Sequence, residues 1–344
     1  MEQAGDQTLA SPYELAKSIL LSEKDTSSGR FTSIDLYGAS ARENSLTDSG
    51  DSRFHLENES GTGDITLYRV FPGIELVYND MHMAYCNKHQ QPAPHVMEIN
   101  YCKEGRCECL FGGDQYCYMS AGDLSFCSLH ESAHQSEFPT SHYHGITVTI
   151  DFSAVTEEME RVLELLTVDL TRIKALSQAK NFTILRADAT AEHIFSELYK
   201  VPPAIRRGYI RVKVLELLLV LTGLDLPTDS AKHISFPAAQ IETVKQIHAF
   251  LLEHFSEHYT IDELSKRFDI SPTTMKKCFR GVYGNSVYAY MKKYRLQVAE
   301  RLLKESRATV GEIALQVGYQ NPNKFTSAFC AEYGIPPTAY RKDV

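Results

Sequence analysis

The sequence lacks the features that would direct a chain into or across a membrane. Its first ten residues, MEQAGDQTLA, have neither the basic start nor the apolar stretch of a signal peptide. The most apolar run, residues 209–224, is interrupted by Arg211, Lys213 and Glu216, so it predicts a buried helix and not a membrane span. We therefore expect a cytoplasmic chain without a membrane partner.

The chain also lacks Cys-x-x-Cys pairs, the spacing of many zinc and redox motifs, although it has eight cysteines. In the cytoplasm we expect reduced thiols and no disulfide framework. We interpret the cysteines as small buried apolar residues, because cysteine packs well in strands. The alternative is that they form a thiol or metal sensor. Six of them fall in one region: Cys86, Cys102, Cys107, Cys109, Cys117 and Cys127.

A net positive charge, the usual mark of a nucleic-acid-binding protein, is missing as well, because the formal charge is -9. The distribution is uneven, however. From residue 264 to the end there are fourteen basic and six acidic side chains, against 21 and 38 in the first 263 residues. This asymmetry predicts a basic module on an acidic body, and a basic module can displace counterions from DNA. A solvated basic face is the alternative.

Changes in composition divide the chain into five segments and predict an α+β fold. Residues 1–63 combine one amphipathic helix with a polar stretch that we expect to be a mobile arm. Residues 64–152 contain short apolar runs between turn residues, which predict a β-barrel or sandwich. Residues 153–226 have helical periodicity, residues 227–239 predict a linker, and residues 240–344 predict only helices.

The last hundred residues contain a duplicated unit. Residues 260–279 align with residues 309–329 after a single one-residue insertion. Each copy begins with a threonine followed three residues later by a glutamate, which fits a capping box at a helix start. After a short turn, a serine or asparagine precedes a proline, which predicts the start of a second helix. Two helix-turn-helix motifs are therefore expected, and the second helix of such a motif can enter the major groove of DNA.

Helical periodicity separates the inner from the outer side chains of these second helices. In the first copy, Met275, Cys278 and Phe279 are expected to face inward. Lysine can reach guanine or phosphate, and asparagine can pair with adenine. The predicted outer side chains are Thr273, Lys276, Lys277 and Arg280 in the first copy, and Asn323, Lys324, Thr326 and Ser327 in the second.

Residues 286–306 predict a single helix between the two motifs. At the usual rise per residue it is about thirty ångströms long. It could hold the two second helices a fixed distance apart, and adjacent major-groove faces are about 34 Å apart. Gly318 and Gly334 are interpreted as turn and stop residues. The alternative for the whole repeat is a helical bundle without a role on DNA.

On these motifs, residues 240–342 resemble the DNA-binding domain of AraC/XylS-type transcription regulators, including the closing segment IALQVGYQNPNKFTSAFCAEYGIPPTAYR. The resemblance implies a sequence-specific regulator of transcription that binds double-stranded DNA and is not an enzyme. RNA polymerase is then a candidate partner. Many members have arginine where Ser327 stands, so we expect the first motif to supply more of the specificity. The implied base-facing residues are Thr273, Lys276, Lys277, Asn323, Lys324 and Ser327.

Residues 95–134 resemble, less closely, the cupin-like barrel that often precedes this domain in the family. The resemblance implies a pocket for a small effector. Apolar faces at residues 190–200 and 205–222 favour a homodimer seam, and a cover for the barrel is the alternative. The candidate effector-binding residues are His95, Glu98, Tyr101 and His134.

The histidines of this region raise the question of a metal. Enzymatic cupins use a close His-x-His followed by a glutamate and a later histidine, whereas HVMEINY supplies only His95 and Glu98. His142-x-His144 comes after the last matching turn. Ordinary barrel histidines are therefore favoured over a bound metal, and we expect no cofactor. A metal-dependent cupin enzyme fused to a DNA-binding module is the alternative function, and a helical module that binds another protein is a second.

Overall fold

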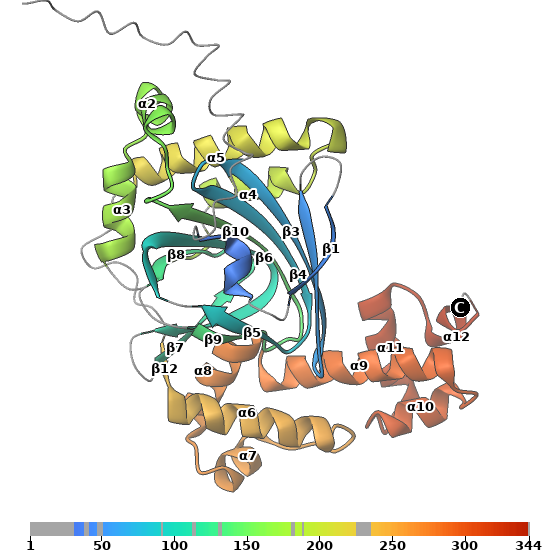
Figure 1. The fold of residues 1–344 in the computed structure, drawn as a ribbon. Helices are drawn as coiled ribbons and strands as arrows, with labels where there is room; N and C mark the ends of the chain where they lie inside the picture. The colour runs from blue at the N-terminus through green and yellow to red at the C-terminus, as the bar shows by residue number, and fades with distance from the viewer. Residues whose placement is uncertain are drawn as a thin grey trace, which may run out of the picture. The chain divides into compact units, whose positions relative to one another are not determined.

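The computed structural model describes residues 31–37, 41–46, 51–90, 92–111, 115–129, 133–179, 183–187, 189–224 and 235–342. The chain divides into two compact units. The first runs to residue 233 without residues 114–117, and the second consists of residues 114–117 and 234–344. The first unit is built on an antiparallel sheet with helices, and the second is helical (Figure 1). In the described part of the chain, no helix combines the length and apolarity needed to cross a bilayer.

An antiparallel sheet forms the body of the first unit. Its hydrogen-bonded order is β1-β2-β3-β4-β10-β6, and β8 pairs with β6 and then with β11. Among the described residues this path is open, so the predicted cupin-like barrel is not confirmed. The strands of the path are β1 (Ala41–Leu46), β2 (Ser52–Asn58), β3 (Gly61–Phe71), β4 (Ile74–His82), β10 (Tyr143–Asp151), β6 (Ala93–Phe111), β8 (Leu124–Leu129) and β11 (Thr183–Leu185). The remaining strands are β5 (Tyr85–Gln90) and β9 (Ala133–Glu137), which pair with each other, and β7 (Gln115–Ser120) and β12 (Phe236–Pro237), which also pair with each other.

Two predictions about this unit are wrong. Residues 41–58, expected in a mobile arm, include β1 and β2, because strand pairing uses backbone groups and does not need an apolar sequence. β2 pairs with β3 over residues 52–58, directly before the turn at Gly61. Residues 183–185, expected in a helical segment, form β11 against β8. The helix predicted at residues 11–22 lies outside the described residues.

One face of the sheet is covered by helices and holds the core. α4 (Ala189–Leu198) and α5 (Arg206–Thr222) lie across it (Figure 1), and α2 (Glu157–Leu165) and α3 (Leu170–Ala179) add to the same apolar cluster. The rings of Tyr101 and Phe195 stack with their centroids 4.7 Å apart, and both side chains are buried. Apolar residues alternate along β4 and β10, so each strand gives one side to this core.

The opposite face of the sheet carries a row of polar side chains beside buried apolar ones such as Val77 and Met81, and it is met by the short 3-10 helix η2 (Ser33–Leu36). The hydroxyl of Tyr37 donates to Asn79 Oδ1 at 2.6 Å, and Asn79 Nδ2 donates to Thr147 Oγ1 at 2.9 Å. Thr147 Oγ1 donates to Asn100 Oδ1 at 2.7 Å. Because these groups are buried or partly buried, each needs such a partner to offset the loss of water.

The second unit confirms the predicted duplication. In each copy the threonine side chain accepts from the glutamate amide, and the glutamate carboxylate accepts from the threonine amide: at 2.7 Å in Thr260–Glu263 and at 2.6 Å in Thr309–Glu312. Gly334 ends the second copy with φ 78°. The helices are α6 (Ala238–Glu253), α7 (Ile261–Arg267), α8 (Pro272–Tyr283), α9 (Val287–Glu305), α10 (Val310–Gln316), α11 (Pro322–Tyr333) and α12 (Pro337–Tyr340).

The stack between β6 and α4 can be tested by truncation. We expect Phe195→Ala to lower the free energy of unfolding of the first unit by about 3 to 5 kcal/mol, because it leaves a cavity under Tyr101. Leu165→Ala is the control, since that side chain is 78% exposed, and its effect should stay within about 0.5 kcal/mol. Urea unfolding of the full chain, with hydrogen exchange to assign the transition to a unit, measures both. Equal effects of the two variants would contradict the assigned core.

Candidate nucleic-acid interface

The second helices of the two motifs, α8 and α11, bury the side chains that periodicity predicted. Met275, Cys278 and Phe279 of α8 are at most 1% exposed. On α11, Phe325 and Phe329 are fully buried. These residues recur at helical spacing, so each helix has one side fixed against its own motif. The other side of each helix is left for solvent or a partner.

All seven residues proposed for DNA contact lie on those outer sides. On α8, Lys276, Lys277 and Arg280 place three cations on one exposed surface, and no carboxylate pairs with them among the described residues. α11 has one cation, Lys324, which aligns with Thr274 of α8 and not with any of its three cations. The side chain of Thr326, also predicted to face outward, is half-buried. The exposed set is Thr273, Lys276, Lys277, Arg280, Asn323, Lys324 and Ser327.

Both helices start at a side-chain cap followed by proline. Ser271 Oγ accepts from the amide of Thr274 at 3.1 Å. Asn321 Oδ1 accepts from the amide of Asn323 at 2.9 Å. Such caps satisfy amides that have no partner within the helix. The two caps therefore fix the first turn of each helix, which contains the first of its outward-facing residues.

A buried arginine on α9 binds the loop that precedes the first motif. Arg295 is 7% exposed. Its Nε donates to the carbonyl of Phe255 at 2.6 Å and its Nη2 to the carbonyl of Glu257 at 2.7 Å. Its Nη1 lies 3.2 Å from Nδ1 of His258. Burial lowers the pKa of Arg295. The guanidinium thus binds the turn between α6 and α7.

His258 extends this contact to the second motif. Its Nε2 lies 2.8 Å from the carbonyl oxygen of Gly318. A carbonyl can only accept, so Nε2 carries the proton and Nδ1 is free to accept from Arg295. Gly318 has φ +85°, which confirms its interpretation as a turn residue, and a Cβ there would lie 2.4 Å from the carbonyl oxygen of Ser256. The close approach of this turn to the loop between α6 and α7 therefore requires glycine.

Sequence reasoning missed Arg295 and His258. One signal was present, since Arg295 falls four residues after Met291 and three before Val298, inside the apolar stripe of α9. A cation in such a stripe indicates a buried charge that needs partners. The partners themselves are some forty residues away in the sequence and give no local signal.

The proposed effector-binding residues do not form one site. Tyr101 lies on the helix-covered face of the sheet, stacked on Phe195. Glu98 pairs with Thr149, whose hydroxyl lies 2.7 Å from that of Ser33, so Glu98 belongs to the opposite, polar face. The side chain of His95 is 46% exposed and lies 3.8 Å from Asp151 Oδ1. The side chain of His134 lies outside the described part of the chain.

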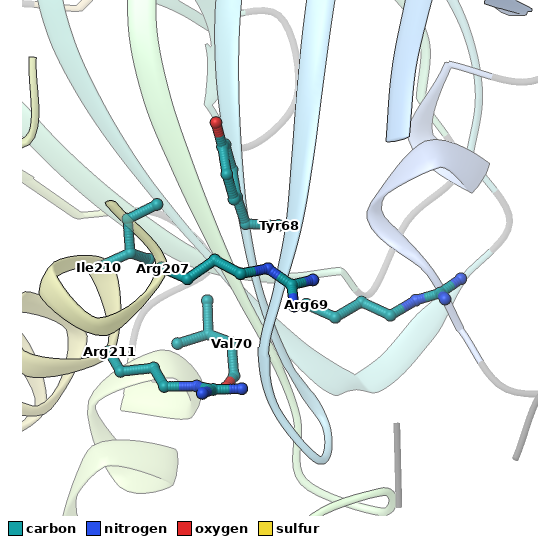
Figure 2. Close-up of a pocket in the computed structure, with 6 residues that line it drawn as sticks. All are labelled: Tyr68, Arg69, Val70, Arg207, Ile210 and Arg211. Carbon is teal, nitrogen blue, oxygen red and sulfur yellow. The ribbon is translucent and has the colours of Figure 1, made fainter. Parts of the chain in front are cut away.

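A small hollow lies between β3 and α5 (Figure 2). Its empty volume is about 190 Å³, below the several hundred cubic ångströms of typical ligand pockets. Two of its arginines already have partners, because Arg207 Nε lies 3.2 Å from Asp51 Oδ1 and Arg211 Nε donates to the carbonyl of Val70. The hollow is therefore a poor candidate for an effector site.

Comparisons with known proteins agree with both units. The family described as "Regulatory protein PchR N-terminal domain" matches residues 61–233, just over half of the chain, and a family described as "Helix-turn-helix domain" matches residues 264–343. The HTH-type transcriptional regulator ExsA of Pseudomonas aeruginosa is 27% identical over 99 residues, which cover 29% of this chain and 36% of that regulator. The uncharacterized HTH-type transcriptional regulator YisR of Bacillus subtilis is 32% identical over 117 residues, 33% of this chain and 41% of that protein.

The crystal structure of the DNA-binding domain of AdpA in complex with a target DNA is 29% identical and covers 29% of this chain and 91% of that one, with a TM-score of 0.29. This chain thus spans less than half the length of the two curated relatives. The relatives named above are transcriptional regulators.

The contact between the motifs can be tested at Arg295. We expect Arg295→Met to destabilise the second unit by about 2 to 4 kcal/mol, because two partly buried carbonyls lose a charged donor and such hydrogen bonds contribute about 1.5 to 3 kcal/mol each. Arg301→Met is the matched control, an exposed arginine on the same helix. Urea unfolding with hydrogen exchange of α9 and α10 measures both variants. If the two variants unfold alike, Arg295 does not hold the unit together.

Proposed function

Because the chain belongs to the AraC/XylS family of transcription regulators, in the group with a regulatory PchR-type N-terminal domain, we propose that it binds double-stranded DNA sequence-specifically and controls transcription. The observation that carries this proposal is the pair of capped second helices whose outer sides expose lysine, arginine and asparagine side chains. DNA is an acceptor-rich polyanion, and such helices fit its major groove. The need to reach DNA also supports the cytoplasmic location expected from the sequence.

The two motifs are proposed to bind successive major-groove segments. α9 has 19 residues and is therefore about 28 Å long, close to the roughly 34 Å between adjacent groove faces. Lys276, Lys277 and Arg280 give α8 three cations where α11 has Lys324 alone. This difference supports the expectation that the first motif reads more of the sequence, and that Ser327 contributes little.

A small effector is proposed to control the protein through the first unit. The match to a regulatory N-terminal domain supports this role. The polar face of the sheet supports it too, because its hydroxyl and amide groups can be offered to a ligand that replaces their present partners. Of the predicted effector-binding residues, Glu98 lies on that face. RNA polymerase is the further partner that we propose for such a regulator.

We also propose that α5 forms the seam of a homodimer. Ile205, Val212 and Leu219, just before and along α5, are 57%, 60% and 41% exposed. Their spacing of seven residues puts them on one stripe of the helix, as in the seam of a coiled coil. A second copy of the chain would cover this stripe and bring four second helices to the DNA.

The DNA contact is tested at Lys276. We expect Lys276→Ala to weaken binding by about 1 to 3 kcal/mol and to relax specificity at one base pair if the side chain contacts a base. If it contacts phosphate instead, affinity should fall equally for all sequences, with a salt slope smaller by about 1. Fluorescence anisotropy on a selected site and on its point variants, over a range of salt, separates the two results.

Arg161→Ala is the control for this measurement, because that side chain is 62% exposed on α2 in the first unit. Its affinity and salt slope should match the unaltered chain. Asn323→Ala measures the second motif, and a smaller loss of specificity than at Lys276 is expected. If Lys276→Ala changes neither affinity nor slope, the assigned face of α8 is wrong.

The dimer is tested at Val212. We expect Val212→Glu to convert the dimer to a monomer, because it places a charge in the middle of the apolar stripe. Leu165→Glu is the matched control, since Leu165 is 78% exposed on α2, outside the stripe. Light scattering coupled to size exclusion gives the mass of each. A monomer mass for the unaltered chain, or a dimer mass for Val212→Glu, refutes the seam.

A further inference from the structure

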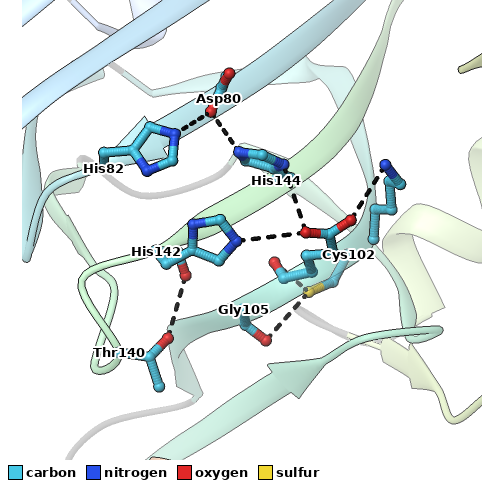
Figure 3. Close-up of polar contacts among 9 residues, drawn as sticks. Asp80, His82, Cys102, Gly105, Thr140, His142 and His144 are labelled. Atoms are coloured by element: carbon cyan, nitrogen blue, oxygen red, sulfur yellow. Dashed lines mark hydrogen bonds and ion pairs between the residues drawn. The ribbon is translucent and has the colours of Figure 1, made fainter. Parts of the chain in front are cut away.

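Three histidines from two neighbouring strands meet at one end of the sheet in the first unit. His82 is the last residue of β4, and His142 and His144 lie just before and within β10. One side-chain ligand atom from each lies within 4.8 Å of the others. The centroids of the His142 and His144 rings are 4.5 Å apart (Figure 3). Histidine is the most common protein ligand of transition metals.

Strand register explains why these side chains share a face. His144 pairs with Asp80 of β4 in the antiparallel ladder. Side chains two residues apart point to the same side of a strand, so His82 joins Asp80, and His142 joins His144. Four potential ligands are thereby placed on one surface without any contribution from a loop tip.

A β-bulge brings a second carboxylate to the same face. β6 and β10 pair with a register shift, so that Cys102 lies opposite Gly145 and Glu104 lies opposite His144. The extra residue, Lys103, turns Glu104 toward the histidines, and a bulge commonly redirects a side chain in this way. Gly105 follows with φ +81°, where a Cβ would lie 1.9 Å from the carbonyl oxygen of His142. Glycine at this position therefore allows the backbones at residues 105 and 142 to pass close together beside the cluster.

Each carboxylate contacts two imidazoles (Figure 3). Asp80 Oδ1 lies 2.9 Å from His82 Nε2 and also contacts His144 Nε2. Glu104 Oε2 lies 3.5 Å from His142 Nε2 and 3.8 Å from His144 Nδ1, while its other oxygen is 3.2 Å from Lys103 Nζ. His144 Nε2 is shielded from solvent, yet it makes no well-directed hydrogen bond. That nitrogen is placed to donate its lone pair to a cation.

We propose that His82, His142 and His144 bind one divalent cation of the first transition row. Asp80 is the fourth ligand, and Glu104 accepts the N–H of the second ring nitrogen of His144. Three imidazoles and a carboxylate suit Zn²⁺, Co²⁺ or Ni²⁺ and do not suit Mg²⁺ or Ca²⁺, which require more oxygen ligands. A carboxylate behind a metal-binding histidine orients its ring and raises its basicity.

The geometry needs only a small side-chain adjustment. With metal–nitrogen distances of about 2.0 to 2.1 Å, the ligand atoms of a tetrahedral site lie roughly 3.3 Å apart. The three histidine ligand atoms, now within 4.8 Å of one another, must therefore move closer together. His82 has room to rotate, since its side chain is 57% exposed, whereas those of His142 and His144 are 35% and 23% exposed. The sequence favoured ordinary histidines here, because His142-x-His144 comes after the last turn that matches the cupin pattern, and no third ligand was assigned to it. The fold supplies it sixty residues earlier, at His82.

The site belongs to the first unit and does not depend on the proposed contact with DNA. The test uses the full chain without an affinity tag, stripped with a chelator and kept reduced. Isothermal titration with Zn²⁺, and elemental analysis after dialysis, should give one equivalent per chain. Co²⁺ should give visible bands of a tetrahedral site without the near-ultraviolet band of a cysteine thiolate, because the proposed ligands are nitrogen and oxygen.

Variants then locate the cation. His142→Ala/His144→Ala should lower the Zn²⁺ affinity at least 100-fold, and Glu104→Gln about 10- to 100-fold, as expected for a partner behind a ligand. His55→Ala is the matched control: His55 Nδ1 lies 2.9 Å from Asp64 on the neighbouring strands, without a second histidine. Its affinity should equal that of the unaltered chain. His82→Ala, at the most exposed ligand, gives a second variant if the double variant does not fold.

The outcomes that overturn the proposal are distinct. If no Zn²⁺ binds at neutral pH, the cluster is only a polar contact between neighbouring strands. If the double variant, shown to be folded by circular dichroism, keeps the full affinity, the cation lies elsewhere. A thiolate band with Co²⁺ would assign it to the cysteines. Loss of DNA binding in Lys276→Ala, by contrast, leaves this site untouched.

Discussion

The second unit depends on one buried cation. Arg295 sits in the apolar side of α9, where an unpaired guanidinium would be far more costly than an apolar residue. Its donors are satisfied by carbonyls of the turn between α6 and α7 and by His258, whose other nitrogen binds the carbonyl of Gly318. The loop that precedes the first motif and the turn of the second motif are thus tied to one side chain.

Local signals made the second unit predictable from the sequence, and distant pairing made the first unit harder to predict. The starts of α7 and α10 are set by a threonine and a glutamate three residues apart, so they could be predicted residue by residue. The strands β1 and β2 have few apolar residues and β11 has only three residues, so all three strands depend on backbone pairing with other strands. Arg295 was equally hard to predict. The apolar stripe that contains it is visible in the sequence, but its hydrogen-bond partners are not.

Side chains alternate between the two faces of a strand. This alternation explains why the predicted effector-binding residues do not form one site and why Glu104 joins the histidine cluster. Glu98 and Tyr101 are close in the sequence, yet an odd separation along β6 directs them to opposite faces of the sheet. A few residues later the bulge at Lys103 reverses the pattern and brings Glu104 to His144. Offsets of one residue therefore decide which polar groups can act together. Such offsets are fixed by pairing with β10, which follows some forty residues later.

Because α9 joins the two motifs, the second motif can contribute to DNA binding even if its own affinity is low. When two binding modules are rigidly joined, engagement of one converts the other into an intramolecular partner with a high effective concentration. In the proposed contact with two groove segments, the link from Arg295 through His258 ties the turn between α10 and α11 to the loop before the first motif, so less freedom is lost when α11 docks. A helix with one cation and a short serine can then prolong the residence of the chain on DNA, although it would hold poorly alone.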